Sequence, residues 1–561
     1  MRIRIPSRPA ALVAAVLFTL AGIGCVKSMP GKAGIAPARD HGPVPGAVEI
    51  LPTDPPAELR AKAARVVPSA RQLRWQALEF QAFVHFGMNT FTDREWGEGT
   101  EDPRLFNPAD LDAGQWVEAV QAAGIKGLIV TAKHHDGFCL WPSLFTEHSV
   151  KNSPWRGGKG DVVGEVAEAC RKGGLAFGVY LSPWDRHEPS YGDSPRYNEH
   201  FKNQLREVLT NYGEVSEVWF DGACGEGPNG KRQVYDWAGY FALIREIQPG
   251  AVISIMGPDA RWIGNEAGVT RESEWSVVPV VGFDDLPDEK NPGGIAHLDA
   301  QAKDLGSMER IAAVATQGGR LIWYPGQVDV SIRPGWFYHA AEDDKVKSLD
   351  HLLDIYYTSV GGNAQLLLNI PPDKRGRIHE NDVRRLKELG DRLRATFAVN
   401  LAEGSKTESG TEITLVDGID ARGRATGYSK RGVTVFSCTL REARAFNVAM
   451  LMEDIGRGQN VEAFAFDVWD GTGLATDRDF FGTTGWREIA KGTTIGWKKL
   501  LRFPTVTAEW VRVRILKSRR DATFFLPKTF GLFLDPGRRT VQEESPAWGH
   551  VPEVHVPGLC P

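Results

Sequence analysis

The sequence has little of what marks several large classes of protein. Its six cysteines are widely spaced over 561 residues and form no CxxC pair, which argues against a disulfide scaffold and a zinc ribbon. It lacks an excess of one charge: 66 basic and 71 acidic residues give a formal net charge of −5. This balance argues against nucleic acid as a partner. After the N-terminal segment, no apolar run is long enough to span a bilayer.

The N-terminus has the layout of an export signal. Arg2 and Arg4 precede an apolar run over 10–23, which is short for a membrane span. The run leads into Ala-Gly-Ile-Gly-Cys, and a small residue before Cys25 resembles a bacterial lipoprotein cleavage site. We therefore expect residues 1–25 to be a signal peptide, and the protein to be secreted or held in the cell envelope. Lipid on Cys25 would then attach it to a membrane, and ordinary cleavage nearby is the alternative.

The middle of the chain alternates between strand and helix patterns. Residues 26–70 are rich in Pro, Ala, Gly and charge and are interpreted as a linker or arm. Residues 71–398 contain buried-strand patterns at 82–86, 127–131, 175–181, 215–220, 252–255, 321–324 and 366–370. Helical patterns separate them, one of them capped by Asp112. Continuous apolar strands covered by helices predict an α/β fold, a (β/α)8-like barrel. A doubly wound sheet is the alternative, but no Gly-rich nucleotide fingerprint supports it.

The last third of the chain changes its periodicity. Val511, Val513 and Ile515 alternate with Arg512 and Arg514. Period-two segments separated by Gly-rich turns predict an antiparallel β-sandwich over 399–537. The remaining residues, 538–561, form a Pro-rich tail.

Polar residues follow several predicted strands. In parallel barrels the chemistry lies at the carboxyl ends of the strands. The residues there are His85, Lys133 to Asp136, Tyr180, Ser182 and Asp221. Imidazole and phenol groups bind hydroxyls, and Trp packs on the apolar face of a ring, so this rim suits a polyhydroxylated ligand. A metal at the adjacent histidines and a Ser-His-Asp triad are weaker hypotheses, because the sequence has neither HExxH nor GxSxG.

Several long motifs resemble those of glycoside hydrolase family 29, the α-L-fucosidases. They are FVHFGMNTF (83–91), KHHDGFCLW (133–141), GVYLSPWD (178–185), VWFDG (218–222), GNEAG (264–268), SIRPGWFYH (331–339) and GGNAQLLLNIPP (361–372). The resemblance covers about residues 75–395. The segment 399–537 resembles a discoidin-like, galactose-binding sandwich. Within the family, EWGEG (95–99) and GNEAG resemble the subgroup that favours α-1,3/1,4-linked fucose on branched glycans.

The resemblance implies roles for individual residues. Asp221 matches the family's nucleophile, and Glu266 matches its general acid/base, with Glu274 as a nearby competitor. The residues that match the fucose pocket are His85, Glu95, Trp96, His134, His135, Tyr180 and Trp219. The implied partner is a fucosylated oligosaccharide or glycoconjugate, and neither a metal nor another cofactor is implied. Gln327 departs from the pattern, since it stands where a Glu is expected.

The residues support the same chemistry without the family name. Retaining hydrolysis needs one ionised carboxylate and one protonated carboxyl group. Asp221 follows a strand and can be held rigidly, whereas Glu266 lies on a loop between Gly264 and Gly268. We expect the pKa of Glu266 to be raised by Asp221 and by partial burial. An exo-glycosidase of another specificity and a non-catalytic glycan-binding protein are the alternatives.

Overall fold

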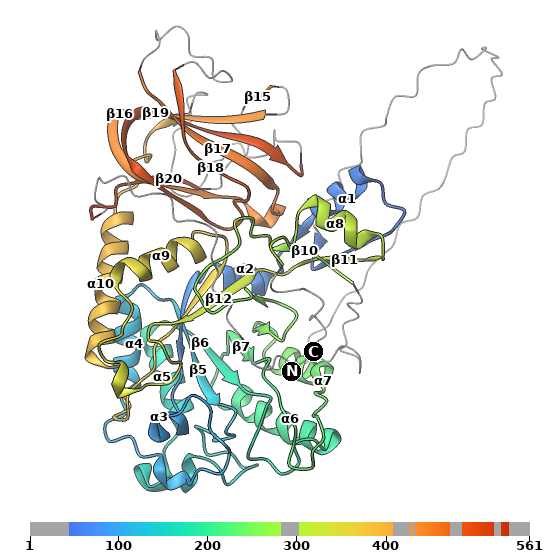
Figure 1. Ribbon diagram of the computed structural model, residues 1–561, viewed down its shortest axis with the longest axis vertical. Coiled ribbons are helices and arrows are strands. Elements are labelled where there is room, and N and C mark those ends of the chain that lie inside the picture. The colour runs from blue at the N-terminus through green and yellow to red at the C-terminus, as the bar shows by residue number, and fades with distance from the viewer. Residues whose placement is uncertain are drawn as a thin grey trace, which may run out of the picture. The chain divides into compact units, whose positions relative to one another are not determined.

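Eight parallel strands form a nearly closed barrel (Figure 1). The computed structural model describes residues 44–281, 302–407, 428–430, 433–471, 485–520 and 529–537, so the expected signal peptide, Cys25 and the tail lie outside the described residues. The barrel strands, in order, are β4 (Phe80–Val84), β5 (Gly127–Lys133), β6 (Ala176–Leu181), β7 (Glu217–Phe220), β8 (Val252–Ile255), β9 (Arg261–Trp262), β12 (Gly326–Ser331) and β13 (Gln365–Asn369). β13 pairs with β4, and an isolated bridge joins Ser254 to Ala260 between β8 and β9. The predicted barrel is confirmed.

Helices connect most of the barrel strands. They are α4 (Ala113–Ala122), α5 (Val162–Gly173), α6 (Ser194–Thr210), α7 (Trp237–Ile247) and α9 (Leu349–Ser359), and α10 (Glu380–Phe397) follows the last barrel strand. Asp112 caps α4 as predicted, because its carboxylate accepts the N–H of Gln115 at 3.0 Å. Five residues link β8 to β9 without a helix, so the barrel is irregular there. In the described part of the chain, every helix is too short or too polar to cross a bilayer.

A small antiparallel sheet corrects one of the predicted barrel strands. It orders β10 (Val277–Val280), β11 (Gly319–Trp323) and β2 (Ala47–Ile50). The apolar run 321–324 was predicted as a barrel strand, which is wrong: it lies in this sheet, and β12 takes the barrel position. An apolar run identifies a buried strand but not the strand with which it pairs.

Residues 44–70 also differ from the predicted linker. They form β1 (Val44–Pro45), β2, α1 (Pro56–Ala63) and β3 (Val66–Val67), and α2 (Ala70–Gln76) follows. Ile50, Leu59 and Val66 are buried with apolar residues of β10, β11 and α8 (Met308–Ala315). The polar composition concealed a few apolar residues that are sufficient for this small core. Shorter helices are α3 (Met88–Thr92) and η1 to η5 (Pro103–Leu105, Val150–Asn152, Trp155–Gly158, Ala340–Glu342 and Ile455–Arg457).

The C-terminal part is the predicted antiparallel β-sandwich, drawn in orange and red in Figure 1. Its strands are β14 (Lys406–Thr407), β15 (Tyr428–Lys430), β16 (Val433–Met452), β17 (Val461–Trp469), β18 (Trp486–Gly492), β19 (Lys499–Ser518) and β20 (Thr529–Phe533). Val511, Val513 and Ile515 are buried in one core, as their alternation predicts. The sandwich also contacts the barrel: Leu500 N–H donates to Gly361 O at 3.0 Å, and Gln459 Nε2 donates to Glu274 O at 2.9 Å.

The barrel interior is layered. A polar layer lies near its amino end, where Glu217 accepts hydrogen bonds from Trp75 Nε1 and Gln81 Nε2, both at 2.6 Å. Above it lies an aromatic layer that includes Phe83 and Trp219. The centroids of these two rings are 5.1 Å apart. This layer forms the floor on which the polar strand-end residues stand.

Candidate active site

The predicted polar residues meet at the carboxyl end of the barrel. They are His85 after β4, His134 and His135 after β5, Tyr180 and Trp219 within β6 and β7, and Asp221 after β7. Ring contacts join them, since Tyr180 stacks on His134 at 5.7 Å and on Trp219 at 5.4 Å. The strand-end prediction therefore located one continuous site.

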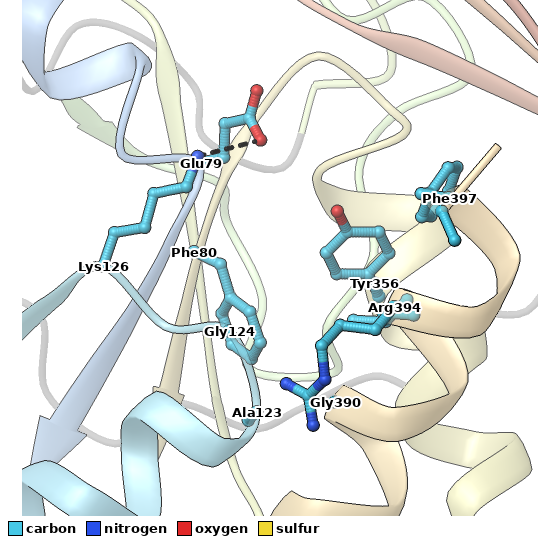
Figure 2. Close-up of a pocket in the computed structure, with 11 residues that line it drawn as sticks. Glu79, Phe80, Ala123, Gly124, Lys126, Tyr356, Gly390, Arg394 and Phe397 are labelled. Carbon is cyan, nitrogen blue, oxygen red and sulfur yellow. Dashed lines mark hydrogen bonds and ion pairs between the residues drawn. The ribbon is translucent and has the colours of Figure 1, made fainter. Parts of the chain in front are cut away.

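A pocket at the amino end of the barrel is a second possible location for a functional site. It measures about 340 Å³ and is lined by Glu79 before β4, Lys126 before β5 and residues of α9 and α10 (Figure 2). In Figure 2 the Lys126 ammonium reaches toward Glu79, with N···O at 3.5 Å. Glu79 also accepts from Trp497 Nε1 at 2.9 Å and pairs with Lys498 at 2.7 Å. Because the amino ends of barrel strands serve stability, we assign this pocket to packing.

Asp221 is held by two donors. The Tyr180 hydroxyl donates to its Oδ2 at 2.9 Å, and the N–H of Ala223 donates to Oδ1 at 2.7 Å. Nε2 of His135 lies 3.8 Å from Oδ2. The two donors fix the orientation of the Asp221 side chain, and its exposed fraction of 24% leaves it accessible to a ligand. Burial and the Asp221 charge raise the pKa of Tyr180 well above its ordinary value, so the phenol keeps its proton and remains a donor.

Glu266 has a different environment. It follows β9 on a loop where Gly264 and Gly268 have φ of +102° and +84°, a conformation that favours glycine. Its Oε2 accepts the Trp336 indole N–H at 3.3 Å. Burial raises the pKa of Glu266, the Trp336 hydrogen bond lowers it, and the charges of Asp221 and Glu95 raise it. The net rise of the pKa favours the protonated form of Glu266, and the negative charge of Asp221 contributes to it.

Glu274, the competitor of Glu266, is bound elsewhere. Its side chain is 1% exposed and pairs with Arg261, and with Arg271 at 3.3 Å. Both carboxylate oxygens are therefore occupied by guanidinium groups. A carboxylate fixed between two arginines is suited to holding the fold rather than to giving up a proton.

The hydrogen bonds of His85 and His134 define their tautomers. Asn369 Oδ1 lies 2.8 Å from His85 Nδ1, so this nitrogen carries the hydrogen and Nε2 can accept. Asn89 Nδ2 lies 3.4 Å from His134 Nδ1, which makes Nδ1 the acceptor and leaves Nε2–H as a donor. Burial lowers the pKa of His85 to about 4 and that of His134 well below its ordinary value. The two rings therefore offer one acceptor and one donor to a ligand.

His135 adds a second acceptor. Ser182 Oγ donates to Trp184 O at 2.7 Å, so its oxygen accepts from Nδ1–H of His135 at 2.8 Å. Burial lowers the pKa of His135, although the charge of Asp221 opposes this. Nε2 of the neutral ring is then a lone-pair acceptor beside Asp221. Alternating donors and acceptors are what neighbouring hydroxyls of a sugar ring require.

Gln327, which departs from the family pattern, lies below the site. It is fully buried, accepts from Trp219 Nε1 at 3.0 Å, and donates to Glu217 at 2.9 Å and to Gln365 at 2.7 Å. It links the polar layer of the barrel to the ring of Trp219. Its side chain is therefore engaged in orienting Trp219 within the barrel.

Glu95 and Trp96 lie on the loop after α3. Trp96 is 42% exposed and packs edge-on against His135 and Trp184, with centroids 5.4 and 5.5 Å away. Glu95 accepts the backbone N–H groups of Trp336 at 2.8 Å and Phe337 at 3.1 Å. Trp96 thus presents an exposed ring, whereas Glu95 is engaged with the loop after β12.

Two residues of the site were missed by the sequence analysis. Trp336 contacts Glu266 and packs against His85 at 5.1 Å. Asp329 on β12 is 5% exposed and accepts from Trp262 Nε1 at 2.8 Å. Burial raises the pKa of Asp329 well above its ordinary value, and the Glu266 charge raises it further. The available signal was a charged residue between Val328 and Val330, but the barrel strand was predicted at 321–324.

Within the part of the chain that the structure describes, the two adjacent histidines of the site are not arranged as part of a metal centre. Among the described residues, no group of three or more His, Cys, Asp and Glu side chains is arranged to hold a metal ion. His134 and His135 use their Nδ1 atoms for contacts to Asn89 and Ser182.

Comparison with known proteins identifies the family. The family model described as alpha-L-fucosidase matches residues 67–278 and 290–396. Alpha-L-fucosidase 1 of Arabidopsis thaliana is 39% identical over 482 residues, which cover 84% of this chain and 88% of that protein.

Solved structures share the fold. A crystal structure from Bacteroides ovatus is 46% identical, with a TM-score of 0.77, and the match covers 91% of this chain and 81% of that chain. A family 29 fucosidase of Ruminococcus gnavus, solved in complex with fucose, is 29% identical with a TM-score of 0.67, over 87% of this chain and 99% of that chain.

Proposed function

This chain belongs to the α-L-fucosidase family of glycoside hydrolases, and from that premise we propose that it is a retaining enzyme that removes terminal α-1,3- or α-1,4-linked fucose. Its substrates are fucosylated oligosaccharides or glycoconjugates. Asp221 is the nucleophile and Glu266 is the general acid/base. His85, His134, His135, Tyr180, Trp219 and Trp96 form the fucose pocket, together with Glu95.

Asp221 and Glu266 differ in their surroundings, and this contrast carries the proposal. Two donors stabilise negative charge on Asp221. Burial and the neighbouring carboxylates raise the pKa of Glu266, which favours its protonated form. Double displacement needs one carboxylate that attacks and one carboxyl group that donates a proton, and these surroundings suit Asp221 to the first role and Glu266 to the second.

The reaction follows in two steps. An Asp221 oxygen forms a bond to the anomeric carbon while the bond to the leaving oxygen breaks, and Glu266 gives its proton to that oxygen. Glu266, now a carboxylate, takes a proton from water, whose oxygen attacks the anomeric carbon and releases Asp221. Two inversions leave the configuration of fucose unchanged.

The linkage preference rests on the loop that carries Trp96. The EWGEG and GNEAG segments resemble the subgroup that favours α-1,3/1,4 linkages. His187 Nδ1 contacts Gly99 O at 2.6 Å, and Arg186 donates to Gly97 O, so the loop is tied to the barrel. Because the loop is held in place, the exposed ring of Trp96 offers a flat apolar surface on which the sugar next to fucose can pack.

Three substrates test this proposal. The enzyme is incubated with a Lewis trisaccharide, 2′-fucosylated lactose and a nitrophenyl fucoside, and the products are followed by NMR, with Asp221→Asn as the background. We expect the fastest release from the Lewis trisaccharide, with α-L-fucose as the first anomer. If β-L-fucose appears first, the retaining mechanism is wrong. Faster release from 2′-fucosylated lactose would overturn the linkage preference alone.

We also propose export through the N-terminal segment and lipid attachment at Cys25. Arg2, Arg4 and the apolar run over 10–23 support it, although they lie outside the described residues. Membrane fractionation of the wild type and Cys25→Ala tests the attachment. We expect the wild type in the membrane fraction and the variant in the soluble fraction; equal distribution would exclude lipid on Cys25.

A further inference from the structure

His339 lies between two carboxylates at the rim of the site. Its Nδ1 is 2.7 Å from Oδ1 of Asp93, and its Nε2 is 2.7 Å from Oε1 of Glu95. Ionised carboxylates only accept hydrogen bonds, so both ring nitrogens must carry hydrogen for both contacts to form. The geometry is therefore that of an imidazolium held between two anions.

The charges around His339 favour this cationic form. Burial opposes it, because only 17% of the side chain is exposed, but the hydrogen bonds and charges of Asp93 and Glu95 outweigh burial and raise the pKa of His339. The nearby acid Glu342 is engaged elsewhere in the same loop, where its Oε2 accepts the N–H of Gly335 at 3.1 Å. His339 is thus a charged clamp whose contacts are complete below pH about 6.5 and are lost as the pH rises through its raised pKa.

Glu95 connects this clamp to the general acid. Its carboxylate accepts the backbone N–H of Trp336 at 2.8 Å and that of Phe337 at 3.1 Å. The indole of the same Trp336 donates to Oε2 of Glu266 at 3.3 Å. One carboxylate therefore fixes the backbone of the residue whose side chain holds Glu266.

The loop is shaped to admit this arrangement. A Cβ on Gly335 would lie 2.7 Å from Oε1 of Glu95 and 2.9 Å from Cδ2 of His339, closer than packed atoms approach. The Trp336 carbonyl is anchored separately by Asn369 Nδ2 at 2.7 Å. Glycine before Trp336 thus lets the carboxylate and the imidazole close over the backbone.

We propose that His339 is a positioning residue for the general acid: it holds Glu95 against the loop, and the loop holds Trp336 against Glu266. This inference rests on the proposed function, in which Glu266 is the acid/base. His339 itself touches neither Glu266 nor the reacting atoms. It acts through Glu95, so Glu95 has a part in aiming the acid besides any contact with fucose.

The clamp also sets the charge near Glu266. The Glu95 carboxylate raises the pKa of Glu266, and the imidazolium beside it offsets that negative charge. Neutral glutamine in place of His339 leaves Glu95 uncompensated, so the pKa of Glu266 should rise. The substitution also removes the His339–Glu95 contact, which the wild type loses at alkaline pH when His339 gives up its proton. Both effects shift the alkaline limb of kcat/KM, where the acid loses its proton, to higher pH.

The first test compares leaving groups. An aryl fucoside with an activated phenol needs little help from a general acid, whereas a Lewis trisaccharide needs the proton fully. General acid–base catalysis contributes about 10²–10⁴-fold, so misaiming Glu266 in His339→Gln should lower kcat on the trisaccharide at least about tenfold. The aryl fucoside should lose less than about threefold. His351→Gln, at an exposed position on α9, is the matched control and should leave both rates unchanged.

The second test uses the pH profile and a second variant. Trp336→Phe keeps the ring against His85 but removes the N–H that lowers the pKa of Glu266, so its alkaline limb should also move to higher pH. Thermal unfolding checks that each variant is folded. If His339→Gln does not fold, Trp336→Phe decides alone, since its contact is the last link to Glu266.

Two results would overturn the inference. One is an equal loss on both substrates, which would make His339 a fucose-binding or structural residue. The other is an unmoved alkaline limb in folded variants. Glu266→Gln separates this from failure of the proposed function: if that variant keeps full activity on the trisaccharide, Glu266 is not the acid. If it loses that activity while His339→Gln matches the wild type, only the positioning role is wrong.

Discussion

The Tyr180 hydroxyl donates a hydrogen bond to Oδ2 of Asp221 at 2.9 Å, while the Tyr180 ring stacks on Trp219 with centroids 5.4 Å apart. One residue thus joins the aromatic floor of the barrel to the carboxylate that the proposed mechanism uses for attack. The orientation of Asp221 is fixed by the β6–β7 pairing, in which Tyr180 stands beside Trp219.

Tyr180→Phe should impair catalysis without loosening the fold. The variant keeps the stacked ring but loses a hydrogen bond to a charged group, which is worth about 1.5–3 kcal/mol, so kcat should fall roughly 10- to 100-fold. Tyr212→Phe is a matched control. The Tyr212 hydroxyl donates a hydrogen bond of 2.9 Å to Asp161, and this pair lies outside the site. Steady-state kinetics and thermal unfolding of both variants are the measurements. Equal kcat in Tyr180→Phe and Tyr212→Phe would contradict the role of Tyr180.

Asp221→Gly should fold and lose most activity, because the covalent step has no nucleophile. Azide can then attack the anomeric carbon from the vacated side, and the product should be the fucosyl azide of inverted configuration. The measurement is product formation from an activated aryl fucoside with and without azide. Tyr180→Phe is the comparison, since it retains the Asp221 carboxylate and should gain nothing from azide. Near-normal turnover of Asp221→Gly without azide would exclude Asp221 as nucleophile.

The strand-end residues could be predicted because parallel strands bring their carboxyl ends to one edge. The periodicity placed His85, His134, Tyr180 and Asp221 on that edge, and the structure has them in ring and hydrogen-bond contact. These residues, which are far apart in the chain, meet there because β4, β5, β6 and β7 pair side by side as parallel strands. Local pattern is sufficient when the fold itself supplies the long-range contact.

Other parts of the site left no local signal. Glu95 reaches backbone N–H groups of the loop after β12, and any sequence there presents such groups. Gln327 and Asp329 interrupt the apolar residues of β12, so this strand lacks a continuous apolar run. The run 321–324 was predicted as a barrel strand, although it pairs with β10. Burial is visible in a sequence, whereas the choice of neighbour depends on the whole fold.

Glu274→Gln should destabilise the protein and spare the chemistry. The substitution leaves the buried Arg261 without its partner carboxylate, and breaking such a pair costs about 3–5 kcal/mol. We expect a lower unfolding temperature, with kcat per folded molecule close to that of the wild type. Glu266→Gln is the matched variant and should show the reverse: little change in unfolding temperature and a large loss on a natural glycan. A folded but inactive Glu274→Gln would move the acid/base role to Glu274.

Asp329→Asn tests whether a third carboxyl group beside Glu266 is neutral. Burial raises the pKa of Asp329 well above its ordinary value, and the charges of Glu266 and Asp221 add to this, so the folded protein holds a proton that the unfolded chain releases near pH about 3.9. Between these two pKa values the folded state binds more protons, so its stability falls as the pH rises.

Asparagine does not titrate and can still accept the Trp262 N–H, which reaches Asp329 Oδ1 at 2.8 Å. We therefore expect Asp329→Asn to gain stability relative to the wild type as the pH rises from 4 toward neutrality, with activity largely kept. Asp329→Ala, which loses the Trp262 contact, should be less stable at every pH. Unfolding temperatures of the three proteins across this range are the measurement. If the stability of the wild type instead rises relative to that of Asp329→Asn with increasing pH, Asp329 is ionised and adds its negative charge to those of Asp221 and Glu95 beside Glu266.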